Sequence, residues 1–240
     1  KKTLLRIRRE YMRLSAKIIL PTLALGSSTF VMQASESVIS VCFNSSLLKY
    51  GGDIAVGAMT ILTSVMQFAM LPLQGLGQGA QPIISYNYGA RNKQRVSSAY
   101  KLLLKASLTY SVLLWLFVMI FPQGFAMMFT SDAALLNFTK NALRIYMGSM
   151  FLFGIQMACQ MTFTALGKAV DSIIVAVMRK FVLLLPLIYI MPNIVTADKT
   201  NAVYMAEPIA DFLAVSFTAV LFIFEFKKAL RSISTESQKA

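Results

Sequence analysis

The sequence contains no histidine and few charged residues, and both shortages limit what the protein can do. Without imidazole groups, a histidine proton relay and a histidine-bound metal centre are excluded. Charged residues make up 14% of the 240 residues, whereas a soluble domain usually has about 25%. The mean hydropathy of +0.64 favours a membrane protein and excludes a soluble enzyme, a disulfide scaffold and a disordered chain.

Cysteine is scarce as well. The two cysteines, Cys42 and Cys159, both lie in apolar runs, which is typical of packing residues. Two thiols alone make a poor metal site, so we expect no metal and no cofactor. The sequence has no Walker loop, no zinc-protease motif and no nucleophile–base pairing, and we therefore expect no enzymatic activity.

Long apolar runs dominate the chain. Six hydrophobic segments can be read from the sequence, at residues 14–48, 54–88, 99–121, 142–166, 173–191 and 202–226. The glycine pair at residues 51–52 predicts a turn between the first two. Irregular backbone cannot face lipid, and barrel strands would alternate over about ten residues. We therefore predict an all-α integral membrane protein, a bundle of six transmembrane helices.

Lysine and arginine are distributed unevenly among the predicted connections. The two ends of the chain and the second and fourth connections hold 19 of the 23 basic residues. Because short basic loops stay in the cytoplasm, we expect both termini to be cytoplasmic and the protein to be multi-pass in the plasma (inner) membrane. We divide the chain into a basic connector (1–13), a transmembrane lobe (14–231) and a tail (232–240). This arrangement explains the net charge of +13 without a nucleic-acid partner.

Three of the carboxylates inside predicted helices are candidates for a function, because a charge there costs about 2.5–3.5 kcal/mol to insert. Glu36 is the only charged residue within residues 18–48 and is a candidate for binding a coupling cation or a cationic drug. Gln33 lies on the same helical face and can add a neutral oxygen. Glu207 and Asp211 share a face of the last helix, where they either have a function or mark the helix start.

Amide side chains mark the second and fourth predicted helices: Gln74, Gln78, Gln81, Gln156 and Gln160. We interpret them as lining a polar cavity, because amides in hydrocarbon need hydrogen-bond partners. The second helix also contains Pro72 and Pro82, and we expect it to be bent or broken between them. Arg179, near the inner end of the fifth segment, is able to snorkel to the cytoplasm.

Residues 75–90, GLGQGAQPIISYNYGA, resemble the second-helix signature of the multidrug and toxic compound extrusion (MATE) family, including Pro82 and Asn87. Two further strings resemble the same family in the same order. TALGKA at 164–169, followed by Arg179, is similar to a stretch between its tenth and eleventh helices, and EPIAD, from Glu207 to Asp211, is similar to the start of its last helix. The bacterial DinF-like branch is the most similar.

MATE transporters usually have twelve helices in two six-helix lobes. The resemblance implies that this chain is the C-terminal lobe, whose partners are the N-terminal lobe, the lipid bilayer and small organic cations. It also implies a cation-coupled antiporter that exports organic cations by alternating access, with sodium ions or protons as the coupling ion. By lobe symmetry, Glu36 corresponds to an acidic residue in the first helix of the other lobe. No aspartate lies between 145 and 167, where other branches have a cation-binding one.

Two alternatives stay open. A flippase for lipid-linked precursors, from the same superfamily, would need a cationic central cavity for a diphosphate, and Arg144 and Arg179 are the candidates for it. A non-transport membrane subunit would need none of these polar residues for transport. A measurement of dye efflux with and without ionophores would distinguish a drug exporter from both alternatives.

Overall fold

The computed structural model describes residues 16–237, with side chains throughout 34–168 and 170–232. The side chain of Gln33 therefore lies outside the described residues. The chain divides into two compact units, Lys1–Val41 and Cys42–Ala240. The described part of the first unit is helical and forms the beginning of α1 (Ala16–Gly89). Each unit is considered by itself below.

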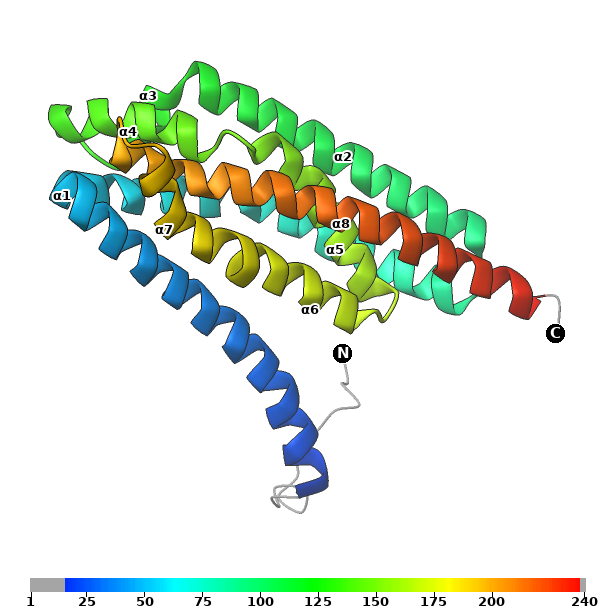
Figure 1. Ribbon diagram of the computed structural model, residues 1–240. Coiled ribbons are helices and arrows are strands. Elements are labelled where there is room, and N and C mark those ends of the chain that lie inside the picture. The colour runs from blue at the N-terminus through cyan, green and yellow to red at the C-terminus, as the bar shows by residue number, and fades with distance from the viewer. Residues whose placement is uncertain (1–15, 238–240) are drawn as a thin grey trace, which may run out of the picture. The chain divides into compact units, whose positions relative to one another are not determined.

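The second unit contains the rest of α1 and the helices that follow it (Figure 1). They are α2 (Lys93–Ile120), α3 (Pro122–Met127), α4 (Ala133–Tyr146), η2 (Met150–Leu152), α5 (Phe153–Ala165), α6 (Ala169–Val177), the π-helix η3 (Met178–Leu184), α7 (Leu185–Ile194) and α8 (Lys199–Ser237). Four helices in the described residues are long and apolar enough to cross a membrane, and a bent pair, α4 with α5, makes a fifth span. The predicted all-α membrane bundle is confirmed.

Gly52 divides α1 into two helices, so each of the six predicted hydrophobic segments is mostly helical over its described residues. Its backbone has φ 66° and ψ −164°, a conformation that glycine adopts without strain. The turn packs against the start of α8, where the Thr200 hydroxyl donates to the Tyr50 carbonyl at 3.0 Å. The predicted turn at residues 51–52 is therefore confirmed.

The second helix is not broken near Pro72 and Pro82, so of the predicted bend or break the break is wrong. Within α1, Gly52 is the one residue with non-helical backbone angles, and residues 53–89 keep a helical path through both prolines. A proline in a helix removes one backbone hydrogen bond. The bonds on either side of each proline keep the helix continuous here.

The break lies instead in the fourth segment, predicted as continuous over 142–166. That span starts earlier, at α4, where the Asp132 carboxylate accepts from the backbone N–H of Ala134 at 2.8 Å. It then bends by 45° between α4 and η2, at residues 147–149. Gly148 and Ser149 are both weak helix formers, which explains why the helix ends there without a proline.

The connections lie at opposite ends of the second unit. At one end, Ile84, Val96, Leu166 and Ala229 form one hydrophobic cluster, which brings together the α1–α2 turn, the α5–α6 loop and the end of α8. Lys168 forms ion pairs there with Glu225 and with Asp171. The α1 turn at Gly52 and the start of α8 lie together at the other end.

The close packing of α5 against α2 generates a stability prediction. A Cβ atom added to Gly154 of α5 would lie 2.5 Å from the Ser107 carbonyl oxygen and 2.6 Å from the Leu108 Cα atom, both in the backbone of α2. We expect Gly154→Ala to separate α2 from α5 and to lower the free energy of unfolding by about 1–3 kcal/mol. Gly75→Ala is the matched control, because its Cβ would meet nothing within 4 Å. Thermal unfolding in detergent should distinguish the two, and equal midpoints would contradict the packing described here.

Candidate functional site: a buried ion-pair network

A network of charged side chains connects three spans inside the second unit. The Arg179 guanidinium of η3 donates from Nε to Asp211 Oδ1 at 2.6 Å and from Nη2 to Glu207 Oε1 at 3.0 Å, both on α8. The Ser149 hydroxyl, at the break between α4 and η2, donates to Asp211 Oδ2 at 3.2 Å. These four residues are called the Arg179 network below.

The two carboxyl groups of the network are removed from solvent, and both are paired with one partly buried guanidinium. Glu207 is 5% exposed and Asp211 is 1% exposed, while the side chain of Arg179 is 22% exposed. The guanidinium also lies over the ring of Phe153, 5.4 Å from its centroid. With both carboxyl groups ionised, two negative charges face one positive charge. Both carboxyl groups are therefore paired with the same guanidinium.

Irregular backbone places each member of the network. Arg179 is the second residue of the π-helix η3, a wide turn often found at functional sites. Glu207 and Asp211 are four residues apart and project from one face of α8, on either side of Pro208. At the break, an added Cβ on Gly148 would lie 3.7 Å from Cβ of Pro208, so the break packs closely against α8.

Helix α2 holds the break in place. The indole Nε1 of Trp115 donates to the Gly148 carbonyl at 3.1 Å, and the Ser111 hydroxyl donates to the Phe151 carbonyl at 3.0 Å. The rings of Trp115 and Phe151 also contact each other edge to face, with centroids 5.4 Å apart. A broken helix frees carbonyl groups that lipid cannot satisfy, so these two donors make the break a stable feature.

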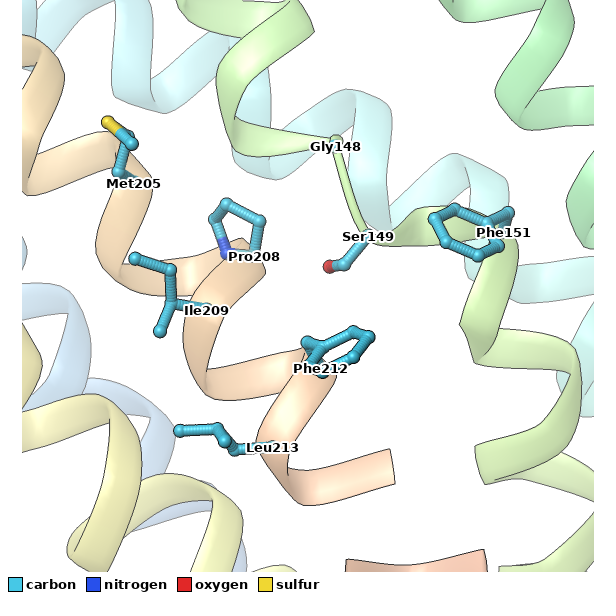
Figure 2. A pocket seen from close by; sticks show the side chains of 8 residues that line it. All are labelled: Gly148, Ser149, Phe151, Met205, Pro208, Ile209, Phe212 and Leu213. Carbon is cyan, nitrogen blue, oxygen red and sulfur yellow. The ribbon is translucent and has the colours of Figure 1, made fainter. Parts of the chain in front are cut away.

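A cavity of ≈ 390 Å³ lies beside the network, between the break and α8. Figure 2 shows Ser149 at the break and Phe151 of η2 on one side of the cavity, and Pro208 and Phe212 of α8 on the other. The other lining residues are Gly148, Met205, Ile209 and Leu213. Apart from the Ser149 hydroxyl, the side chains that line the cavity are apolar. The cavity suits a hydrophobic group next to the network.

The structure adds Arg179 to Glu207 and Asp211, which the sequence placed together on one face of the last helix without this partner. Glu36 is an exposed side chain on the helix of the first unit. Asn87 is buried and its amide donates to the Ile83 carbonyl at 2.8 Å, which gives it a structural role, and Pro82 is exposed. The predicted cavity-lining amides differ in exposure: Gln74 and Gln78 are exposed, Gln81 and Gln160 are half-buried, and Gln156 is buried.

Sequence reasoning missed Ser149, Trp115 and Ser111. The glycine–serine pair at residues 148–149, in the middle of an apolar segment, was the available signal for the break. The interpretation of Arg179 as a residue that snorkels to the cytoplasm is wrong, because its guanidinium binds two buried carboxylates. Those partners lie 28 and 32 residues away along the chain, beyond the reach of any local pattern.

Replacing Arg179 should lower the stability of the fold. Arg179→Met leaves Glu207 and Asp211 buried without a positive charge, and we expect a loss of about 3–5 kcal/mol in the free energy of unfolding. Adding Glu207→Gln and Asp211→Asn to Arg179→Met should restore part of that loss. Arg95→Met, at an exposed arginine, serves as the control. Thermal unfolding followed by size-exclusion chromatography measures the parent, Arg179→Met, the triple variant and Arg95→Met. An unchanged unfolding midpoint for Arg179→Met would show that the network does not stabilise the fold.

Comparisons with known proteins agree with this architecture. Solved structures that share the fold include a MATE transporter in a bent conformation, with a TM-score of 0.82, 20% identity, and coverage of 97% of this chain and 51% of that one. A MOP superfamily transporter from Pyrococcus furiosus has a TM-score of 0.80 and 20% identity, and the match covers 95% of this chain and 51% of that chain. At these identities the likeness shows the fold alone.

Curated relatives are similar in sequence over most of the chain. Multidrug export protein MepA of Staphylococcus saprophyticus is 25% identical over 183 residues, which is 75% of this chain and 40% of the relative. MepA of Staphylococcus aureus strain N315 is 26% identical over 167 residues, which is 70% of this chain and 36% of that protein. The match thus spans less than half the length of these relatives. The MatE family model matches residues 28–190, and the chain therefore belongs to the MatE family of multidrug and toxic compound extrusion transporters.

Proposed function

We propose that this chain forms one six-helix lobe of a cation-coupled exporter of organic cations. The lobe would act with a second, N-terminal lobe by alternating access, and sodium ions or protons would drive export. Family membership supports transport, and the similarity to multidrug export proteins supports small, chemically varied substrates. That the match spans about half of the related transporters supports a two-lobe assembly.

A polar stripe on α1 is the observation that carries this proposal. Five uncharged polar side chains lie on one face of the 53–89 helix, at spacings of seven, four, three and four residues: Gln67, Gln74, Gln78, Gln81 and Ser85. All are exposed except Gln81, which is half-buried. Amides cannot face hydrocarbon without partners, so this face is suited to a polar cavity. We assign Gln74, Gln78 and Gln81 to that cavity, together with Gln156 and Gln160.

Glu36 is the carboxylate that we propose for binding the coupling ion or the drug, together with Gln33. Its side chain is exposed on an apolar helix, where Val38 and Val41 are also exposed, at 46% and 64%. A negative charge in such surroundings attracts one monovalent cation at a time. Occupancy by the coupling ion then excludes an organic cation, which is the simplest physical basis for exchange.

The flippase alternative is less well supported by the geometry. A diphosphate needs free cationic groups, and Arg179 already donates to Asp211 and Glu207. Arg144 donates to the Met119 carbonyl at 3.2 Å, at the end of α2. Neither arginine is therefore available as an unpaired cation inside the described bundle. An organic cation fits the remaining polar, uncharged surface better than an anion does.

Efflux of a cationic dye tests this function. In cells that express the transporter containing this chain, ethidium efflux should be abolished by an ionophore that collapses the cation gradients. Glu36→Gln keeps the shape and removes the charge, and we expect it to lower gradient-driven efflux by about tenfold or more while expression persists. Asp53→Asn is the matched control, because Asp53 is an exposed carboxylate at the α1 turn.

The same efflux assay also tests the polar stripe on α1. Gln78→Leu should reduce ethidium efflux, whereas Gln123→Leu, at an exposed position in α3, should leave it unchanged. Efflux that persists in the presence of the ionophore would overturn cation coupling. Full efflux by Glu36→Gln between about pH 6 and pH 8 would place the coupling site elsewhere.

The orientation in the membrane is proposed from the basic loops, with both termini in the cytoplasm of the cell and the protein in its inner membrane. Asn92 and Ser232 are exposed near the end where the α1–α2 turn and the C-terminal part of α8 lie, and Gln123 lies in α3 (Figure 1). With Cys42 and Cys159 replaced, a membrane-impermeant thiol reagent applied to whole cells should label Gln123→Cys. It should not label Asn92→Cys or Ser232→Cys, and the reverse pattern would refute this topology.

A further inference from the structure

Two cationic side chains on α4 are not paired with a carboxylate among the described residues. Lys140 and Arg144 are four residues apart and share a face of the helix. Helices α2, α3 and α4 contain no acidic residue, and neither cation forms an ion pair within the described part of the chain. The proposed transport mechanism uses neither side chain.

The other basic side chains at this end of the bundle do have a partner. Lys49 and Lys199, near the α1 turn, both lie over the ring of Tyr50, with their Nζ atoms 5.2 and 5.6 Å from its centroid. The face of an aromatic ring attracts a cation. Lys140 and Arg144 have no ring contact of this kind among the described residues. A group from outside the bundle is therefore the natural source of their opposite charge.

Arg144 lies at the level of the lipid headgroups. Its Nε donates at 3.2 Å to the carbonyl of Met119, the residue before the last of α2. The 28 residues of α2 reach about 42 Å, whereas the hydrocarbon core is about 30 Å thick, so the ends of α2 extend to the phosphate groups. The side chain of Arg144 is exposed, and its two terminal nitrogens, Nη1 and Nη2, have no partner among the described residues. Such a pair of donors matches two oxygens of a phosphate.

The apolar cavity begins one helical turn away from this guanidinium. Gly148, four residues after Arg144, lines the cavity of ≈ 390 Å³ together with Phe151, opposite Phe212 (Figure 2). This volume lies within the range of about 300–1,000 Å³ that is usual for small-molecule sites. Phe212 and Leu213 are 58% and 45% exposed, so the cavity opens on the surface of the bundle. A lipid acyl chain can therefore enter it directly from the bilayer.

We propose that this surface binds one anionic phospholipid, with its phosphate on Arg144 and Lys140 and one acyl chain in the cavity beside Gly148 and Phe212. Cations at the headgroup level and an apolar cavity one turn deeper together fit a molecule with a negative head and an apolar tail. An organic cation would be repelled by both side chains, so the site is separate from the proposed drug path. Inorganic phosphate lacks the chain that fills the cavity.

Trp115 is placed to report an acyl chain in the cavity. Its ring contacts the ring of Phe151, which lines the cavity, with centroids 5.4 Å apart. Its indole also donates to the carbonyl of Gly148, another lining residue. Trp115 is the single tryptophan of this sequence. Bromine atoms on an acyl chain quench the emission of a nearby tryptophan, so a brominated chain in the cavity should quench Trp115.

The test uses the purified transporter that contains this chain, in micelles of an uncharged detergent. The Trp115 signal is the difference between the emission of the parent protein and that of Trp115→Phe, recorded as brominated phospholipid is added. We expect saturable quenching by brominated phosphatidylglycerol. Brominated phosphatidylcholine, whose choline offsets the phosphate charge, should bind with an apparent affinity at least fivefold weaker. Unbrominated phosphatidylglycerol should also raise the midpoint of thermal unfolding, a measurement that does not depend on Trp115.

Two pairs of variants test the two halves of the site separately. Replacing both Lys140→Gln and Arg144→Gln should weaken the binding of phosphatidylglycerol about tenfold or more, whereas Arg95→Gln, at an exposed arginine near the start of α2, should leave it unchanged. Ile209→Phe places a larger side chain in the cavity and should lower the maximal quenching. Val220→Phe is its matched control, because Val220 is 56% exposed on α8 and does not line the cavity.

The comparison of the two headgroups in the parent protein decides the question even if a variant fails to fold. Equal quenching by both lipids would show only lipid that surrounds the protein, and an absence of saturable quenching would show that the second lobe covers the cavity. Either result would overturn the proposal, as would full binding by the Lys140→Gln, Arg144→Gln protein. The lipid site does not rest on the proposed function. A protein that binds phosphatidylglycerol in this way but does not export ethidium would retain the site and refute the function.

Discussion

The fold depends on how the second unit accommodates charge in an apolar interior. Glu207 and Asp211 are buried beside the partly buried Arg179, and each carboxylate would be costly to bury alone. Their pairing fixes the rotation of η3 and α8 about their axes, because a turn of either helix would leave a charge facing hydrocarbon. Ser149 extends the same constraint to the α4–α5 break. A single group of hydrogen bonds thus sets the register of three spans.

Irregular backbone is tolerated where another helix supplies the missing donors. The carbonyls of Gly148 and Phe151 are exposed by the break, and Trp115 and Ser111 of α2 satisfy both. Close packing of α2 against α5, made possible by Gly154, keeps these donors within reach. The break, the π-helix and Pro208 therefore lie together because each frees backbone that the others can shield from lipid.

Hydropathy was sufficient to predict the membrane bundle, since a run of apolar residues determines a span regardless of its neighbours. The turn at Gly52 and the cap at Asp132 were also predictable, because both depend on the residues of the turn itself. The partners of Arg179 were not predictable, because they come from a helix that the sequence alone does not place next to it. The break predicted near the prolines is absent for a related reason, because whether Pro82 breaks a helix depends on the whole helix around it.

The placement of charges also explains why the polar stripe on α1 matters. Lys168 is paired with Glu225, and Arg179 with both carboxylates of α8, so the second unit neutralises these side chains through its own contacts. The amides at Gln74 and Gln78 are exposed on α1 instead of being buried in the bundle. If Gln74 and Gln78 served only packing, their amides would be expected to find partners inside the bundle, as Lys168 and Arg179 do. Their outward position is instead what a surface requires when its hydrogen-bond partners are water, a substrate or a second lobe.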